Sequence, residues 1–248
     1  MPQYAYVIIS GQPRYTESSV CSIRDRMIKP LRDNGFDPVV ISCTWPANSY
    51  NKFASSELEE PEDKMLNFVR EQLRPEIMHF EKHVDFFANR QSNRIQVPLA
   101  EAPSYESQYY CLQKACKLMR NHIDATGKRP SLVVKTRADL IYLKSMSSIS
   151  IKESVGKCMI PATEGWGWRG DSPPKPWMNR KRWLPDQMWM GPMQQMEHMM
   201  SFYKKWHPNL KRFGNNIEHM LWAHSEAARI KWIPFRFLIK IERTINNK

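Results

Sequence analysis

The feature that most constrains this chain is the run from Leu132 to Tyr142, which reads LVVKTRADLIY. Apolar and β-branched residues fill both ends of the run, but Lys135, Arg137 and Asp139 interrupt it. A fully buried strand would exclude such groups, because an unpaired buried charge is costly, and a surface strand would alternate polar and apolar residues. The pattern therefore predicts a core strand that ends in a cleft, with Arg137 and Asp139 pointing outward together. The alternative is an ordinary strand that ends in a structural Arg–Asp pair.

The composition is that of a folded protein with a sizeable core, since 42% of the 248 residues are hydrophobic and 11% are aromatic. No apolar run reaches the roughly 18–20 residues that a bilayer span needs. The first residues carry no basic leader, and the five cysteines are scattered without a C-x-x-C pair. We therefore expect a cytoplasmic protein with reduced thiols, either free or peripheral on a membrane.

Strand and helix patterns alternate from the first residues onward. An apolar run over residues 4–10 is followed by a helical pattern from Ser18 to Leu31 and a second apolar run from Pro38 to Trp45. This strand–helix–strand order predicts a parallel sheet with a right-handed crossover. Further helices are predicted over residues 64–81 (broken by Pro75), 104–122, 193–206 and 216–228, and further strands over 157–161, 186–191 and 230–237. Residues 84–87 form either a short strand or the end of a helix.

Residues able to bind a ligand follow the predicted strands, at the edge where open α/β sheets hold their ligands. They are Ser10, Gly11, Gln12, Arg14, Thr44, Arg137 and Asp139. Gly11 lets a ligand approach the backbone closely, Arg14 and Arg137 can hold phosphate, and Asp139 can hold a hard divalent cation. This combination suits a nucleoside diphosphate held with Mg²⁺ or Mn²⁺.

Several common catalytic motifs do not occur in the sequence. It contains no G-x-x-x-x-G-K-[ST] loop, no G-x-G-x-x-G after the first strand, no G-x-S-x-G and no H-E-x-x-H. His79 and His83 share the i,i+4 spacing of a metal-binding pair, but with no third ligand in sight we expect a solvent-exposed pair.

Four short motifs taken together resemble a known family. They are Ser-Gly-Gln-x-Arg after the first strand, Thr44-Trp45 after the second, Lys-Thr-Arg-Ala-Asp-Leu at residues 135–140, and Asp-Gln-x-x-x-Gly at residues 186–191. Over Tyr4 to Arg243 the chain resembles the small GT-A-type glycosyltransferases of lipopolysaccharide and capsule synthesis, including WavE-like proteins, and those of large algal viruses.

The resemblance implies a fold and an activity. The fold is α/β, GT-A-like and Rossmann-like, with a mixed, mainly parallel sheet flanked by helices in a single domain over residues 1–248. Residues 1–145 would form the nucleotide-sugar-binding half and residues 146–248 the acceptor-side half. The activity is the transfer of a sugar from a nucleotide-diphosphate sugar to a glycan or to a lipid-linked acceptor hydroxyl.

The resemblance also implies roles for the strand-end residues. Ser10, Gly11, Gln12 and Arg14 match the nucleotide-binding loop, and Thr44 joins the same donor site. Arg137-Ala138-Asp139 stands in the place of the D-x-D motif, which binds a divalent ion and the diphosphate. Arg137 replaces the first acid of that motif, so Asp139 is the one metal ligand assigned there, for Mn²⁺ or Mg²⁺. Alternatively, Arg137 contacts the diphosphate directly.

A carboxylate is needed to deprotonate the acceptor hydroxyl in an inverting transfer. Asp186 is assigned this role by analogy with the D-Q motif of the family, with Asp171 and Glu164 as weaker candidates. The alternative for Asp186 is an acid that stabilises a turn after Pro185.

The long Trp-rich loop over residues 165–182 is predicted to shape the acceptor site. Trp166 and Trp168 are assigned to acceptor binding, because a flat indole ring stacks well on a sugar face. The alternative is that these rings anchor the loop by being buried.

The net charge of +12 keeps two non-enzymatic alternatives open. One is a nucleic-acid-binding module whose charge is interleaved with aromatic residues such as Tyr203 and Trp206; on the resemblance, no nucleic-acid partner is expected. The other is a membrane-surface protein that binds anionic lipid through the basic segment Lys231–Lys248, with residues such as Ile233 and Phe235 inserted shallowly. Membrane binding is compatible with the transferase, because acceptors can be lipid-linked.

Overall fold

The computed structural model describes residues 2–11, 14–44, 62–80, 102–161, 184, 186–213, 217–235 and 239–241. The strands in these ranges are β1 (Gln3–Gly11), β2 (Phe36–Thr44), β3 (Ile77–Phe80), β4 (Pro130–Thr136), β5 (Leu140–Tyr142), β6 (Cys158–Pro161), β7 (Trp189–Gly191), β8 (Trp232–Phe235) and β9 (Ile239–Ile241). The helices are α1 (Glu17–Ile23), the π-helix η1 (Arg24–Ile28), α2 (Lys29–Asp33), α3 (Glu62–Leu73), α5 (Ala102–Thr126), α6 (Ser148–Ser154), α7 (Met193–Met200), the 3₁₀ helix η4 (Phe202–Lys205), α8 (Trp206–Phe213) and α9 (Ile217–Ala227).

Seven of the strands form one mixed sheet in the order β3-β2-β1-β4-β7-β6-β8. β1 runs parallel to both β2 and β4, β2 runs parallel to β3, and β7 is antiparallel to β4 and β6. The predicted α/β class, with a mixed and mainly parallel sheet flanked by helices, is confirmed. The chain leaves β1 toward β2 on one side and returns to β4 on the other, so strand order reverses between β1 and β4.

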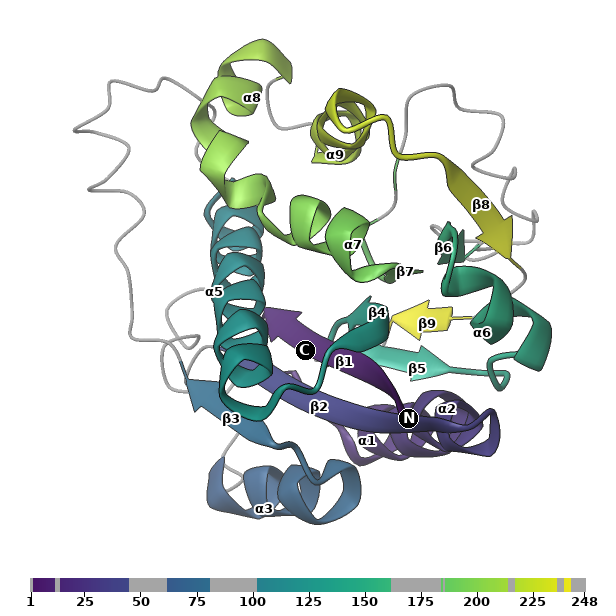
Figure 1. Ribbon diagram of the computed structural model, residues 1–248. Coiled ribbons are helices and arrows are strands. Elements are labelled where there is room, and N and C mark those ends of the chain that lie inside the picture. Colours follow the sequence, from purple (N-terminus) through teal and green to yellow (C-terminus); the bar gives the residue numbers. More distant parts are fainter. Residues whose placement is uncertain are drawn as a thin grey trace, which may run out of the picture.

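Helices cover both faces of the sheet (Figure 1). α5, α7 and α9 pack on one face, in a core that includes Tyr6, Tyr109 and Trp189. α1, α2 and α3 pack on the other face, whose core includes Val7 and Val134. Alternate residues of β1 and β4 enter the two cores because successive side chains of a strand point to opposite faces. Among the described residues no helix is long and apolar enough to cross a membrane.

A proline in the first helical segment helps to hold β5 and the residues that follow it. Pro30 has no N–H, so the carbonyl of Arg26, four residues earlier, is free of its usual helical partner. The backbone N–H of Met146 donates to that carbonyl at 2.9 Å. In addition, the N–H of Tyr142 donates to Ser22 Oγ at 3.1 Å. These two bonds fix β5 and the residues after it against the α1–α2 segment.

The run Leu132–Tyr142 is not one strand. β4 ends at Thr136, Arg137–Asp139 form a turn, and Leu140–Tyr142 form β5, which pairs with β9 in a separate two-stranded sheet. The sequence pattern could not reveal this break, because the partner of β5 comes from the far end of the chain. The third strand of the parallel part is Ile77–Phe80, within the predicted 64–81 helix, and residues 84–87 are outside the described part of the chain.

Two histidines join α7 to α9 and predict an acid-sensitive contact. The rings of His198 and His224 stack with centroids 4.1 Å apart, and the Nε2 of each bonds the backbone carbonyl of the other, at 2.9 and 2.8 Å. Burial, together with the nearby charge of His198, lowers the pKa of His224 to about 4.

We expect this contact to make folding stability fall as the pH drops from about 6.5 to about 4. The pKa of His224 is lowered in the folded state, so between these two pH values the unfolded chain binds the proton more readily than the folded protein does. The stability is fully present above pH 6.5, and the loss reaches roughly 3 kcal/mol. Urea unfolding at several pH values tests this, with His224→Gln as the variant that keeps an N–H donor and cannot titrate. If the free energy of unfolding of the wild type and of His224→Gln changed with pH in parallel, this prediction would be wrong.

Candidate functional site

Arg137 lies at the centre of a buried ionic cluster at the end of β4. Its Nε and Nη2 donate to the two carboxylate oxygens of Asp139, at 2.9 and 2.6 Å. Its Nη1 donates to Asp186 Oδ2 at 3.0 Å. The Arg137 side chain is 19% exposed, whereas those of Asp139 and Asp186 are 5% and 4% exposed. The expectation that Arg137 and Asp139 point outward together is therefore wrong: the two side chains pair with each other, as the structural alternative anticipated.

Asp186 enters the cluster from a bend that precedes β7, rather than from a strand as predicted. Gln108 of α5 donates from Nε2 to Asp186 Oδ2 at 2.9 Å, on the same oxygen that Arg137 contacts. Three segments far apart in the sequence, around residues 108, 137 and 186, thus meet at one carboxylate. A charge-assisted bond from a guanidinium fork fixes orientation as well as position.

Lys135 lies two residues before Arg137 and is fully buried. Its Nζ donates to the backbone carbonyl of Asp186 and lies 3.4 Å from that of Gln187. The same nitrogen lies 4.7 Å from the ring centroid of Trp189, a cation–π distance. The lysine therefore fastens the 186–189 segment to β4.

The charges of the cluster shift the pKa values of its members. Burial alone would raise the pKa of Asp186, but the positive charges of Arg137 and Lys135 outweigh burial and the pKa is lowered. Burial lowers the pKa of Lys135 to about 7, although the carboxylate of Asp186 opposes this shift. Burial would also lower the pKa of Arg137, but Asp186 and Asp139 raise it instead. Asp186 and Arg137 are thus held ionised at neutral pH.

The end of β1 adjoins this cluster. Ile8 is opposite Lys135 in the β1–β4 register, so Ser10, two residues on, lies on the same face of the sheet as Lys135. Gly11 has a φ of +110°, and a Cβ built on it would lie 3.4 Å from Gln108 Cγ. A side chain at Gly11 would therefore be strained by the backbone conformation, and its Cβ would contact Gln108, the residue that bonds Asp186.

Of the other predicted residues, the structure describes Thr44 and Arg14, and the rest lie outside the described ranges. Thr44 is opposite Gly11 in the β1–β2 register, so its side chain is on the opposite face from that of Ser10. Arg14 is exposed between β1 and α1. Gln12, Trp166 and Trp168 lie outside the described residues, as do Asp171 and Glu164.

Two hydroxyl groups at the strand ends are buried without a hydrogen-bond partner among the described residues. They are Ser10 Oγ and Thr44 Oγ1, both on fully buried side chains. A buried hydroxyl that lacks a partner is unusual, since most such groups are bonded. Both atoms are at the carboxyl edge of the parallel strands, where a polar ligand would meet them.

The described residues do not fit the predicted Mn²⁺ or Mg²⁺. Both carboxylate oxygens of Asp139 already accept from Arg137, and that guanidinium would repel a divalent cation. Among the described residues no group of three or more His, Cys, Asp or Glu side chains could hold a metal ion.

Sequence reasoning missed two members of the cluster. Gln108 lies on α5 with no motif around it, and only the packing of α5 on β1 and β2 brings it to Asp186. Lys135 carried a usable signal, because it is a charged residue inside an apolar strand pattern. That signal indicates a special environment without revealing which backbone carbonyls satisfy the ammonium group.

The surface alternatives lose part of their support. Trp206 is 1% exposed and stacks on Tyr109 with centroids 5.8 Å apart, so its ring is not available to nucleic-acid bases. Phe235 is buried, and Ile233 packs against the same core. Phe235 is therefore not available for shallow membrane insertion, and membrane binding by the segment Lys231–Lys248 stays a prediction.

No protein-family model and no curated protein matches the chain. Among solved structures, one that it resembles is 4-diphosphocytidyl-2C-methyl-D-erythritol synthase from Anaerococcus prevotii DSM 20548, with 8% identity, a TM-score of 0.44, and coverage of 95% of this chain and 89% of that one. Another is CTP:phosphocholine cytidylyltransferase from Streptococcus pneumoniae, with 9% identity, a TM-score of 0.44, and coverage of 99% and 95%. Similarity at this level assigns neither a reaction nor a substrate to this chain.

Proposed function

We propose that this protein is a glycosyltransferase that moves a hexosyl or pentosyl group from a nucleoside-diphosphate sugar to a hydroxyl of a glycan or lipid-linked acceptor. The observation that carries the proposal is the position of the Arg137–Asp139–Asp186 cluster at the carboxyl ends of β1 and β4. Strand order reverses between these two strands, and open α/β sheets bind nucleotides at that point.

The donor would lie across the ends of β1 and β4. The Arg137 side chain is 19% exposed and would face the diphosphate, while Asp139 holds its guanidinium in a fixed orientation. Gly11 would allow the diphosphate to approach the backbone. Ser10 Oγ, which has no hydrogen-bond partner among the described residues, would bond to the donor. In this proposal Arg137 takes the part that a metal ion has where the D-x-D motif is complete.

In the transfer, the acceptor oxygen forms a bond to the anomeric carbon of the sugar. The bond from that carbon to the β-phosphate oxygen breaks, and the nucleoside diphosphate leaves with the electron pair. The acceptor proton passes to a carboxylate, for which Asp186 is assigned. Its lowered pKa keeps Asp186 ionised, so it can accept a proton once its bonds to Arg137 and Gln108 loosen.

The finer assignment, to transferases of the lipopolysaccharide, capsule and large-algal-virus kind, belongs to the same proposal. Its support is the set of four short motifs at residues 10–14, 44–45, 135–140 and 186–191. The described members of three of these motifs lie at the carboxyl edge of β1, β2 and β4, as a shared donor site requires.

We expect Asp139→Asn to weaken nucleotide binding at least about tenfold, because Arg137 loses the carboxylate that orients its fork. Titration calorimetry with a panel of UDP- and GDP-sugars measures this, with and without Mn²⁺. Asp33→Asn is the matched control, since Asp33 forms an exposed ion pair with Lys29. If the wild-type protein gives no heat and hydrolyses none of the panel, the proposed function is wrong.

A further inference from the structure

Lys135 is the most unusual side chain of the cluster, because it is ionisable and fully buried yet forms no ion pair with a carboxylate of the described residues. Its exposed fraction is 0%, and no carboxylate of the described residues lies within salt-bridge distance of its Nζ. The contacts that the structure gives it are two backbone carbonyls and the ring of Trp189. A methionine would fill the same space without the cost of burying a charge. The arrangement therefore contributes something other than packing.

The charge of Lys135 balances the cluster. Asp139 and Asp186 contribute two negative charges and Arg137 contributes one positive charge, so without Lys135 the cluster carries a net charge of −1. With a protonated Lys135 the net charge is zero. A diphosphate at the end of β4 would be repelled by the first state and not by the second.

The contacts of Lys135 also fix the geometry of Asp186. By bonding the carbonyls of Asp186 and Gln187, the ammonium group holds the bend before β7 against β4. That bend presents the Asp186 carboxylate to Arg137 at 3.0 Å. Movement of the bend would change the orientation of the guanidinium that we propose faces the donor.

We propose that Lys135 is a positioning residue of the donor site, which sets the Asp186–Arg137 pair and supplies the charge that makes the cluster tolerate a diphosphate. This inference rests on the proposed function. It assigns to the site a preference for anionic ligands that depends on a residue the ligand does not touch.

The test compares a charged probe with its uncharged counterpart. At a pH below 7, where Lys135 is protonated, UDP and GDP are titrated into the wild-type protein, Lys135→Met, Lys135→Gln and Lys135→Arg, in parallel with uridine and guanosine. We expect the Met and Gln variants to bind the diphosphates at least about tenfold more weakly, because a buried unit charge acts on them through a medium of low dielectric. Nucleoside binding should be unchanged, and Lys135→Arg should recover part of the diphosphate affinity.

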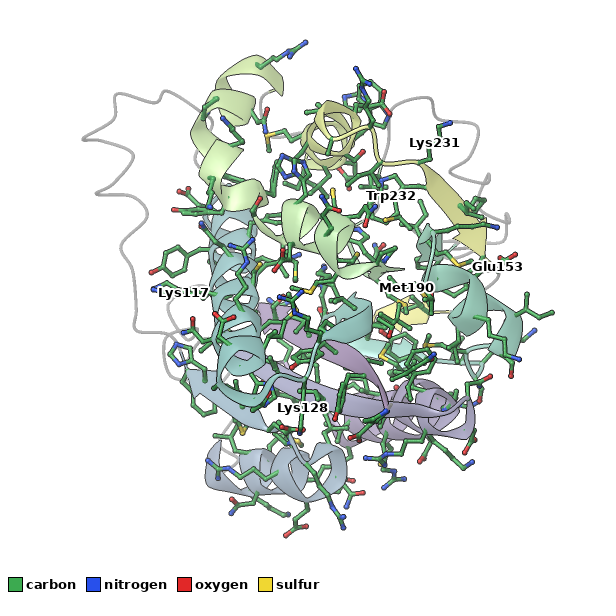
Figure 2. The ribbon with its side chains drawn as sticks, in the orientation of Figure 1. Lys117, Lys128, Glu153, Met190, Lys231 and Trp232 are labelled. Carbon is green, nitrogen blue, oxygen red and sulfur yellow. The ribbon has the colours of Figure 1, made fainter. Side chains whose placement is uncertain are left out.

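Lys117→Met is the matched control, since Lys117 is an exposed lysine on α5 (Figure 2). A Met or Gln variant that binds diphosphates as tightly as the wild type overturns the inference while leaving the proposed function intact. Equal losses for nucleosides and diphosphates also overturn it, because they indicate a general loss of structure. A wild-type protein that binds no diphosphate overturns the proposed function and this inference together.

Discussion

Replacing Arg137 by methionine should lower the free energy of unfolding by roughly 3–5 kcal/mol, because the change leaves Asp139 and Asp186 buried without their shared cation. Both carboxylates accept charge-assisted hydrogen bonds from this one guanidinium, at 2.6–3.0 Å. Urea unfolding at neutral pH measures the loss. Arg137→Lys should lose less, since a lysine keeps the charge but not the planar fork that contacts two carboxylates.

The control for this prediction is a surface arginine with a similar bidentate contact. Arg120 bonds Glu197 at 2.8 and 3.3 Å, but its side chain is 54% exposed. Arg120→Met should therefore cost less than about 1 kcal/mol. In the triple variant Arg137→Met, Asp139→Asn, Asp186→Asn, part of the lost stability should return, because neither carboxylate is left buried without its cation. If Arg137→Met and Arg120→Met lowered the free energy of unfolding equally, Arg137 would not be the shared cation of two buried carboxylates.

The second large effect is a pH dependence of stability that belongs to Lys135. Burial lowers its pKa from 10.5 to about 7 in the folded protein. Between these two values the unfolded chain binds the proton that the folded protein has released, so stability rises with pH. This contribution is fully present above about pH 10.5 and is lost as the pH falls to about 7.

Lys135→Met isolates this contribution, because every other titrating group is common to both proteins. We expect the stability difference between the wild type and Lys135→Met to move in favour of the wild type by roughly 3 kcal/mol between pH 7 and about pH 9.5. Urea unfolding across that range measures it, and Lys117→Met should give a curve parallel to that of the wild type. A parallel curve for Lys135→Met would instead mean that Lys135 keeps its ordinary pKa.

The parallel part of the fold could be predicted from local patterns. Residues 4–10 and 38–45 carry β-branched and apolar runs separated by a helical pattern, and β1, α1 and β2 lie there. The second sheet could not, because Leu140–Tyr142 pair with Ile239–Ile241 across about a hundred residues of sequence. Likewise, no local signal tells that the strand pattern breaks into a turn at Arg137–Asp139.

The site was predictable where residues follow strands and unpredictable where they come from packing. β1 ends with Ser10 and Gly11, and Arg137 and Asp139 come just after β4; the parallel register brings these two strand ends together. The sequence could not predict that Arg137 forms ion pairs with both Asp139 and Asp186. Gln108 comes from α5 and Asp186 from the bend before β7. Their contacts place Arg137 at the centre of a buried cluster, where the sequence had predicted an outward-pointing group.

In the proposed function, a sugar nucleotide binds where strand order reverses between β1 and β4. The most direct measurement is a crystal structure of the wild-type protein with a UDP- or GDP-sugar bound. We expect the diphosphate at the carboxyl ends of these strands, within hydrogen-bonding distance of Arg137 and the Gly11 backbone. A sugar nucleotide bound elsewhere on the protein, with Arg137 contacting only Asp139 and Asp186, would contradict it.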